Sequence, residues 1–437
     1  MFFLVILGFT ALAAFRGSVD AQGPANRTNT TTSALNPFGT GFLLSNASGG
    51  YVYNATGNLT SAEPRPFTPS GGLGNNGSEP NYHPLTDYDY QSLLFVLYQK
   101  FFELNLFESG LRNFSTADFQ RAGLDANDRS LIEFMADQER GHVTLIQNIL
   151  GPSAINRCNY TYTYRTVPEF IDFSRNVTGW GESGVYGFLE HLDSRAAAQL
   201  LLQTVTTEAR QEMIFRQFEG LFPVPVWFQT EITQSMAWTL LSRYIRGCST
   251  DSPRLAWQNF PALNITNNPN PLLNLTSPSN STSPPPSNFT STALSPGIFV
   301  NATNATNATF TPGITSNRTA FSFPGRVVQL AADFPGKSVG PNGSYVTNST
   351  AGAPRFAAWI SQLNTTYSVL ENVQNVSNGW TATTRQPNDT VFPDVNEQVV
   401  NGTMFIVATD ANISVTPYNI SELNSHVVAG PGQYFAG

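Results

Sequence analysis

Asp137-Gln-Glu-Arg-Gly-His142 is the segment most informative about the fold of this chain. It lies within residues 127–150, where apolar side chains recur every three or four positions, the period of an α-helix with one buried face. Glu139 and His142 are three positions apart, so they lie on the same apolar face of that helix. Ionisable groups that face an apolar interior need a charged partner or a metal ion. The stretch therefore predicts a helix packed in a bundle with a polar centre.

Four further segments predict the helices that complete this bundle. The two longest end at a glycine, Gly110 for one and Gly220 for the other, as many helices do. The expected helices span residues 87–109, 180–189, 194–219 and 232–245. We therefore expect an all-helical domain from residue 82 to residue 260.

The other expected helices carry residues that could complete a metal site around Glu139 and His142. Glu-x-x-His on facing helices, with a glutamate from each of two other helices, is the ligand pattern of a dimetal carboxylate centre. Gln211 stands at the position where a second histidine would complete this pattern. The candidate metal ligands are Glu103, Glu139, His142, Glu182 and Glu208.

The chain resembles a known family of secreted fungal proteins with a ferritin-like domain, described as stress-response or late sexual-development proteins. The resemblance rests on the segments Tyr98-Gln-Lys-Phe-Phe-Glu103, Asp137-Gln-Glu-Arg-Gly-His142, Trp180-Gly-Glu-Ser-Gly-Val-Tyr, Glu208-Ala-Arg-Gln-Glu-Met and Asn401-Gly-Thr-Met-Phe. It extends over most of the chain beyond residue 85. It implies a ferritin-like bundle and a role in stress response or sexual development.

Two residues depart from the wider ferritin-like group, which commonly reads Glu-x-x-Glu in the first helix and Glu-Ala-Arg-His in the fourth. Here the motifs read Lys100-Phe-Phe-Glu103 and Glu208-Ala-Arg-Gln211. An ammonium group repels a metal ion, and a glutamine amide binds iron less well than an imidazole. The sequence leaves open whether Lys100 or Glu103 occupies the ligand position. We expect a degenerate bundle without a cofactor, in which Lys100 pairs with Glu139 or Glu208; the alternative is a site for iron or manganese.

The segments before and after the bundle differ from it in composition. Residues 22–81 and 261–318 are rich in Gly, Pro, Ser, Thr and Asn, which predicts a disordered glycosylated arm and a glycosylated linker. Short apolar or β-branched segments between turns predict a small β-rich, sandwich-like domain over residues 319–437. Its expected strands include residues 327–332, 356–360 and 403–409. The expected fold class is thus α+β with two domains.

The first residues predict export from the cell. Phe2–Ala14 is uncharged and apolar but too short to span a bilayer, and small residues follow at Val19 and Ala21. Residues 1–21 therefore predict a signal peptide. No later segment reaches eighteen apolar residues, which predicts no membrane span. We expect a secreted protein that is extracellular or held at the cell wall or surface.

The acceptor sites for N-linked glycans agree with export. The sequence contains twenty-five Asn-x-Ser/Thr acceptors, including Asn-Ala-Thr three times in succession from Asn301. N-linked glycans are therefore expected partners, and cell-wall polysaccharide is a further one. Net charge is −8 and no basic patch is visible, so nucleic acid is not an expected partner.

Cys158 and Cys248 are the two cysteines of the sequence. In an oxidising compartment an even pair most often forms a disulfide, and two unrelated thiols are the alternative. The bond would close a loop of about ninety residues and stabilise the fold by roughly 4 kcal/mol.

The leading functional hypothesis is a non-enzymatic secreted or cell-surface glycoprotein with a degenerate ferritin-like domain. One alternative is a di-iron or dimanganese carboxylate oxidoreductase, which requires Lys100 to point away from the carboxylates. The other is a protein that binds cell-wall carbohydrate or a partner through the C-terminal domain. That alternative requires Trp359 or Trp380 at the surface, where an aromatic ring could stack on a sugar.

Overall fold

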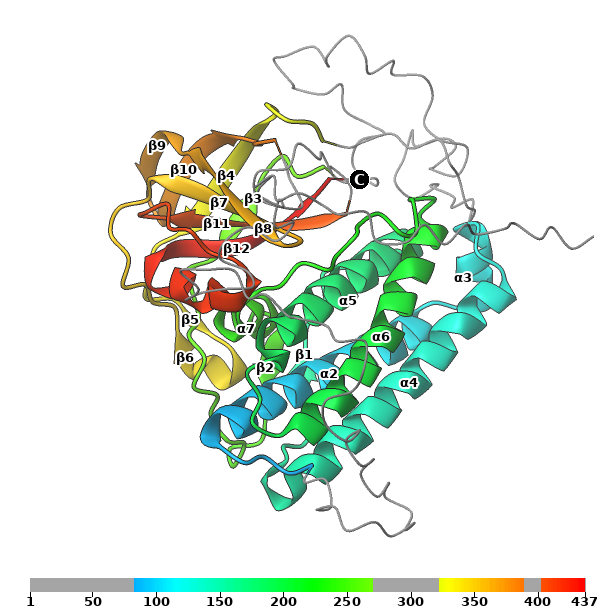
Figure 1. The fold of residues 1–437 in the computed structure, drawn as a ribbon. Coiled ribbons are helices and arrows are strands. Elements are labelled where there is room, and N and C mark those ends of the chain that lie inside the picture. Colours follow the sequence, from blue (N-terminus) through cyan, green and yellow to red (C-terminus); the bar gives the residue numbers. More distant parts are fainter. Residues whose placement is uncertain (1–81, 270–321, 389–401, 437) are drawn as a thin grey trace, which may run out of the picture. The chain divides into compact units, whose positions relative to one another are not determined.

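The computed structural model describes residues 82–269, 322–388 and 402–436, in which a helical bundle is followed by antiparallel β-sheets (Figure 1). This arrangement confirms the expected α+β fold class. The expected signal peptide and glycosylated arm lie outside the described residues, as does the expected linker after residue 269. No helix within the described ranges is long and apolar enough to cross a membrane.

Four long helices form the bundle, with α2 packed mainly against α4 and α5 against α6 (Figure 1). These helices are α2 (Asp87–Asn113), α4 (Ala126–Leu150), α5 (Val167–Leu189) and α6 (Arg195–Phe218). Two shorter helices accompany them, α3 (Thr116–Arg121) and α7 (Gln234–Ser242). Helices α4, α6 and α7 agree with the expected segments to within a few residues.

Two helices are longer than expected. Helix α2 continues past Gly110, where the ring of Phe170 on α5 packs against the glycine and leaves no room for a side chain. Helix α5 begins at Val167 rather than near Trp180, because Thr166 caps it by accepting a hydrogen bond from the backbone N–H of Glu169. Most of α5 is buried, including Asp172 and Arg175 of its first half, whose charges do not suggest a buried helix.

Helix α2 runs through the interior of the bundle. Every residue from Ser92 to Leu104 is buried, including Lys100 and Glu103. Charged residues are almost never fully buried unless they are paired. Charged side chains on this buried part of α2 therefore need partners of opposite charge inside the bundle.

Gly187 of α5 sets how closely the chain before α7 approaches the bundle. A Cβ atom at this position would lie 2.0 Å from the carbonyl oxygen of Ile232. That backbone is held in place by a 3.1 Å hydrogen bond from Ile232 N to Ser183 O, so it cannot easily yield. We expect Gly187→Ala to lower the free energy of unfolding by about 2 kcal/mol, measured by chemical denaturation.

Gly141 of α4 provides the matched control for this substitution. Nothing lies within 4 Å of a Cβ atom built there. Alanine also favours a helix over glycine, so Gly141→Ala should raise the free energy of unfolding by up to about 1 kcal/mol. Equal effects of the two alanine substitutions would contradict the packing assigned to Gly187.

The C-terminal region contains two four-stranded antiparallel sheets. The first has the order β3 (Leu263–Ile265), β4 (Val327–Asp333), β10 (Gly379–Arg385) and β9 (Glu371–Val376). The second has the order β12 (Val427–Phe435), β11 (Thr403–Thr409), β7 (Phe356–Ser361) and β8 (Asn364–Val369). Side chains from both sheets share one apolar core, which includes Leu330, Trp359 and Ile406. The expected sandwich-like arrangement and the expected strands β4, β7 and β11 are confirmed.

Short elements connect these parts. They are the strands β1 (Asn159–Tyr160), β2 (Ile245–Gly247), β5 (Ser338–Val339) and β6 (Tyr345–Val346), and the 3₁₀ segments η1 (Gly151–Ser153), η3 (Pro341–Gly343) and η4 (Pro417–His426). Strands β1 and β2 pair with each other, as do β5 and β6.

Two expectations for this region need correction. The linker was expected from residue 261, but Leu263–Ile265 forms β3 and pairs with β4, because Leu263 is buried in the core of the sandwich. The carbohydrate-binding alternative required Trp359 or Trp380 at the surface. Both are core residues, 1% and 4% exposed, so neither ring is available to stack on a sugar.

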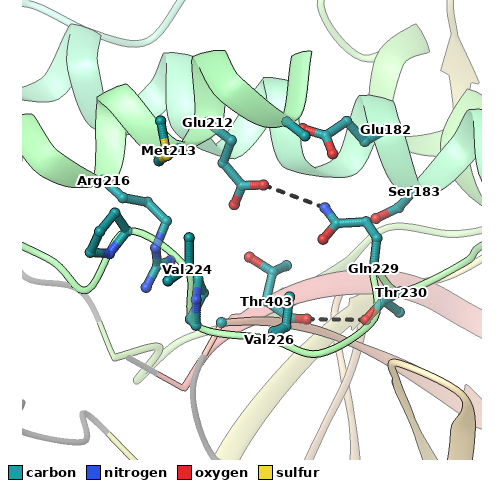
Figure 2. Close-up of a pocket in the computed structure, with 14 residues that line it drawn as sticks. Glu182, Ser183, Glu212, Met213, Arg216, Val224, Val226, Gln229, Thr230 and Thr403 are labelled. Carbon is teal, nitrogen blue, oxygen red and sulfur yellow. Dashed lines mark hydrogen bonds between the residues drawn. The ribbon is translucent and has the colours of Figure 1, made fainter. Parts of the chain in front are cut away.

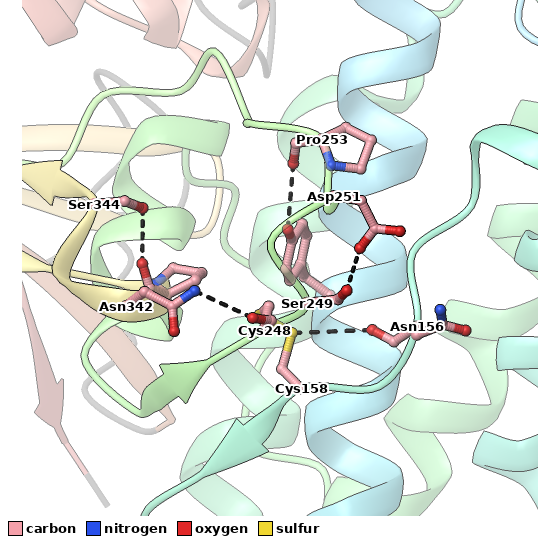
Figure 3. The surroundings of a disulfide bond; sticks show 10 residues. Asn156, Cys158, Cys248, Ser249, Asp251, Pro253, Asn342 and Ser344 are labelled. Carbon is pink, nitrogen blue, oxygen red and sulfur yellow. Dashed lines mark hydrogen bonds between the residues drawn. A yellow bond between two sulfur atoms is a disulfide. The ribbon is translucent and has the colours of Figure 1, made fainter.

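Cys158 and Cys248 form the expected disulfide (Figure 3). Cys158 directly precedes β1 and Cys248 directly follows β2, so the bond closes one end of this two-stranded ribbon. The amide of Asn342 donates a 3.1 Å hydrogen bond to the carbonyl oxygen of Cys248. This hydrogen bond holds the end of the ribbon next to η3, while the disulfide itself closes a long loop.

Candidate functional site

A lysine occupies the centre of the cluster of ionisable side chains inside the bundle. Nζ of Lys100 contacts the carboxylate of Glu103 one turn further along α2. It also lies 2.7 Å from Oε2 of Glu208 on α6 and 3.5 Å from Oε2 of Glu139 on α4. The expected pairing of Lys100 with Glu139 or Glu208 is confirmed, and both carboxylates are engaged. One ammonium group thus joins three helices.

His142 lies at the edge of this cluster, toward α6. Its Nδ1 atom is 3.2 Å from Oε1 of Glu139 and 3.8 Å from Oε1 of Glu208. Its Nε2 atom is 3.1 Å from the hydroxyl oxygen of Thr207, which also donates to a backbone carbonyl of α6. The imidazole therefore faces the carboxylate oxygens that the lysine leaves open.

Gln211 acts as a hydrogen-bond donor where the family pattern has a histidine. Its Nε2 atom donates to Oε1 of Glu139 at 3.0 Å and to Oε1 of Gln138 at 3.1 Å. These two acceptors fix the orientation of the amide, with its NH₂ group toward the carboxylate. A side chain that presents N–H groups to the site cannot at the same time serve as a ligand through its oxygen.

Close packing between α2 and α5 holds Glu103 in place. Its Oε1 atom accepts a 3.3 Å hydrogen bond from Gln99, one turn earlier on α2. A Cβ atom at Gly181 of α5 would lie 2.2 Å from the amide nitrogen of Gln99 and 2.7 Å from Oε1 of Glu103. Gln99 was not among the expected site residues, although its four-residue spacing from Glu103 places it on the same helix face.

The charges of the cluster shift one another's pKa values. Burial alone would lower the pKa of Lys100, but the carboxylates of Glu103, Glu139 and Glu208 raise it above its ordinary value. Burial alone would raise the pKa of Glu139, but Lys100 and then His142 lower it to about 2. For Glu103 burial prevails over the lowering effect of Lys100, and its pKa lies well above the ordinary value. Lys100 therefore stays charged, and the glutamates share its single positive charge.

The lowered pKa of Glu139 makes stability depend on pH. Because the folded state favours the charged form, Glu139 stabilises the fold above pH 4.5, and this contribution is lost as the pH falls toward 2. Glu139→Gln should cost on the order of 3 kcal/mol at neutral pH, and the difference from wild type should shrink below pH 4.5. Urea unfolding at a series of pH values measures it. The exposed Glu371, changed to glutamine, is the control, and a pH-independent difference for Glu139→Gln would contradict the assignment.

Glu182 does not join the cluster around Lys100. It lies on α5 and is 1% exposed, and its Oε1 atom has no hydrogen-bond partner among the described residues. Its neighbour Gly181, rather than Glu182, faces Gln99 and Glu103. Glu182 instead lines a cavity together with Glu212 of α6. The structure therefore brings four of the five expected ligands into direct contact with Lys100 or with one another. Glu182 makes no such contact, although the charges of Glu208 and Lys100 still act on its pKa.

The residues present fit one metal ion better than two. Glu139, His142 and Glu208 offer ligand atoms that all lie within 4.8 Å of one another. Oε1 of Glu208 is buried without a hydrogen-bond partner in the described part of the chain, and Nδ1 of His142 has the nearby Oε1 of Glu139 as its neighbour. A second ion would lack ligands. The Lys100 ammonium contacts the Oε2 atoms of Glu139 and Glu208, and Gln211 directs an N–H donor rather than an oxygen toward the site.

Comparisons with known proteins agree with this architecture. Residues 88–221, which contain the four long helices, match the ferritin-like domain family. Over 390 residues the chain is 50% identical to protein rds1 of the fission yeast Schizosaccharomyces pombe, with 89% of this chain and 90% of that protein aligned. The chain belongs to the rds1 family. Because the aligned length far exceeds residues 88–221, the rds1 family shares more than the bundle with this chain.

Proposed function

We propose that this rds1 family member is a secreted or cell-surface glycoprotein whose ferritin-like bundle is a structural scaffold rather than an enzyme. The observation that carries the proposal is the position of Nζ of Lys100, which contacts the carboxylates of Glu103, Glu139 and Glu208. The resemblance to secreted fungal proteins adds a role in stress response or sexual development.

The chemistry of an ammonium group supports a scaffold role for the cluster. A fixed ammonium supplies positive charge and hydrogen bonds to buried carboxylates, as a metal ion would. It offers no redox states and no open coordination position, which are the features that metal catalysis uses. With Lys100 in place, the buried glutamates are compensated by the protein itself.

Three features of the chain support export. These are the apolar segment Phe2–Ala14, the twenty-five Asn-x-Ser/Thr acceptors and the disulfide between Cys158 and Cys248. Disulfides persist in oxidising environments such as the secretory pathway and the cell exterior. N-glycans would also provide solubility to a chain with only 12% charged residues.

Fractionation of the native host tests the export proposal. A tagged copy of the full chain should appear in the medium or the cell-wall fraction, and enzymatic removal of N-glycans should increase its electrophoretic mobility. Replacing the acceptors Asn301, Asn304 and Asn307 by glutamine should shift the mobility of the untreated protein in the same direction. A cytosolic protein whose mobility is unchanged by deglycosylation would contradict the proposal.

A second candidate function is favoured by the geometry of Glu139, His142 and Glu208. These residues would hold a single iron or manganese ion, which would supply redox chemistry to an oxidoreductase. Glu139 and Glu208 would bind through the oxygen that faces His142, while Lys100 would keep their other oxygen.

Titration with Mn²⁺ distinguishes the two candidates without an activity assay. Free Mn²⁺ gives an electron paramagnetic resonance signal that weakens when the ion is bound. The scaffold proposal expects the same signal in the presence of wild type and of His142→Ala. A saturable loss of signal with wild type that His142→Ala abolishes would instead favour the single-metal site.

A further inference from the structure

A cavity of about 170 Å³ lies beside the bundle, and Lys100 is not among its lining residues (Figure 2). Helices α5 and α6 form one wall, the chain over residues 223–230 forms another, and Thr403 of β11 closes the opposite side. Neither the scaffold role nor the single-metal candidate uses this cavity.

The polar groups of the cavity are dominated by two carboxyl groups. Oε1 of Glu182 is buried without a hydrogen-bond partner among the described residues. Oε2 of Glu212 has one long hydrogen bond of 3.4 Å from the amide of Gln229 (Figure 2). Burial raises the pKa of Glu182 well above its ordinary value, and the carboxylate of Glu212 raises it further. Two ionised carboxylates here would repel each other, so Glu182 favours its neutral form while no cation lies beside it.

The other walls of the cavity contain several apolar side chains and one guanidinium. Met213 of α6 and the side chains of Val224 and Val226 face the same space as the two acids (Figure 2). Arg216 also lines the cavity, and its Nε atom donates a 2.7 Å hydrogen bond to the carbonyl oxygen of Phe222. The cavity therefore combines an acidic end with an apolar wall.

We propose that this cavity binds a small organic cation, a primary amine with a compact apolar body. The ammonium group would lie between the carboxyl groups of Glu182 and Glu212, and the body would pack against Met213, Val224 and Val226. A buried carboxylate gains most from a charged hydrogen-bond donor, which here would satisfy Oε1 of Glu182.

The chemistry of the lining excludes other ligand classes. An anion would meet two acidic side chains against the single guanidinium of Arg216, and a neutral ligand would give Glu182 no charged partner. A bare metal ion would need more than two carboxylate ligands and would not use the apolar wall. The cluster around Lys100 is a precedent within this protein, because there an ammonium group pairs with several buried glutamates.

The volume of the cavity sets the size of the cation. An engineered apolar cavity of about 150 Å³ holds one benzene molecule. A cavity of about 170 Å³ therefore accommodates a six-membered ring with one amino group. Cyclohexylamine, which is a cation at neutral pH, is the appropriate probe; cyclohexanol and cyclohexanecarboxylate are its neutral and anionic counterparts.

Isothermal titration calorimetry on the full glycosylated chain tests the proposal, with a chelator in the buffer. Cyclohexylamine should bind saturably and at least tenfold more tightly than cyclohexanol, and cyclohexanecarboxylate should not bind. Glu182→Gln and Glu212→Gln should each weaken amine binding at least tenfold. Glu371→Gln, the same change at an exposed position on β9, should leave binding unchanged.

A pocket-filling variant keeps the test decisive if a glutamine variant fails to fold. Ala209 is an exposed residue of α6 that lines the cavity, so Ala209→Leu should fold and should abolish binding while both acids remain. Amine binding that survives Ala209→Leu, equal binding of cyclohexanol, or no binding of cyclohexylamine to wild type would each overturn the proposal. None of these variants changes Lys100, so the result does not depend on the scaffold role.

Discussion

Lys100→Met is expected to lower the free energy of unfolding by about 3 to 5 kcal/mol, the cost of leaving buried charges without their partner. Methionine is unbranched like lysine and fills similar space, but it carries no charge. The substitution therefore leaves Glu103, Glu139 and Glu208 buried together without their common cation. Guanidinium chloride unfolding followed by circular dichroism measures the loss.

The sequence provides a matched control for this substitution, because it contains only one other lysine, Lys337. Its Nζ atom lies 2.6 Å from Asp333, but its side chain is 47% exposed. Surface ion pairs contribute little, so Lys337→Met should change the free energy of unfolding by less than about 1 kcal/mol. Similar losses for the two methionine variants would show that the buried cluster does not depend on its ammonium group.

Loss of the disulfide is expected to have the second large effect. Cys158 and Cys248 are 90 positions apart, and the chain-entropy relation for a loop of this length gives about 4 kcal/mol of stabilisation. The double variant Cys158→Ala/Cys248→Ala should lose this amount in a denaturation experiment. A reducing agent should destabilise wild type to a similar degree and leave the double variant unchanged. An effect of the reducing agent on both proteins would contradict this account.

The helical period in the sequence was sufficient to predict most of the cluster around Lys100. Glu139 and His142 could be placed together from their spacing alone, because both lie on a helix with one clear apolar face. Glu103 and Glu208 followed from the bundle pattern, and the ion pairs of Lys100 followed from its need for a buried partner.

Glu182 could not be placed in the same way, because its direction depends on how α5 is rotated in the bundle. The second half of α5, where Glu182 lies, is buried on nearly every side, so this part of the sequence does not show which face meets α2. The decisive contact is Gly181 against Gln99 and Glu103, and successive helical residues point about 100° apart. With Gly181 toward α2, Glu182 turns toward Glu212 and the cavity.

Strand β3 was hidden for another reason. Leu263–Ile265 stands at the start of a segment rich in Asn, Pro and Ser, whose composition indicates a linker. Its stability comes from pairing with β4, which is more than sixty residues further along the chain. The composition of the whole segment indicates a linker and does not reveal that its first few residues form a strand. Three residues are enough to add a strand to a sheet whose other strands already form the core.

Elemental analysis of the full chain, purified from its native host without chelators, is the decisive test of whether an ammonium group rather than a metal ion occupies the centre of the bundle. We expect no stoichiometric iron or manganese in wild type, and the same result for Glu139→Ala. Stoichiometric iron or manganese in wild type, lost in Glu139→Ala, would contradict the scaffold role. A metal content that His142→Ala also abolishes would place the ion at Glu139, His142 and Glu208.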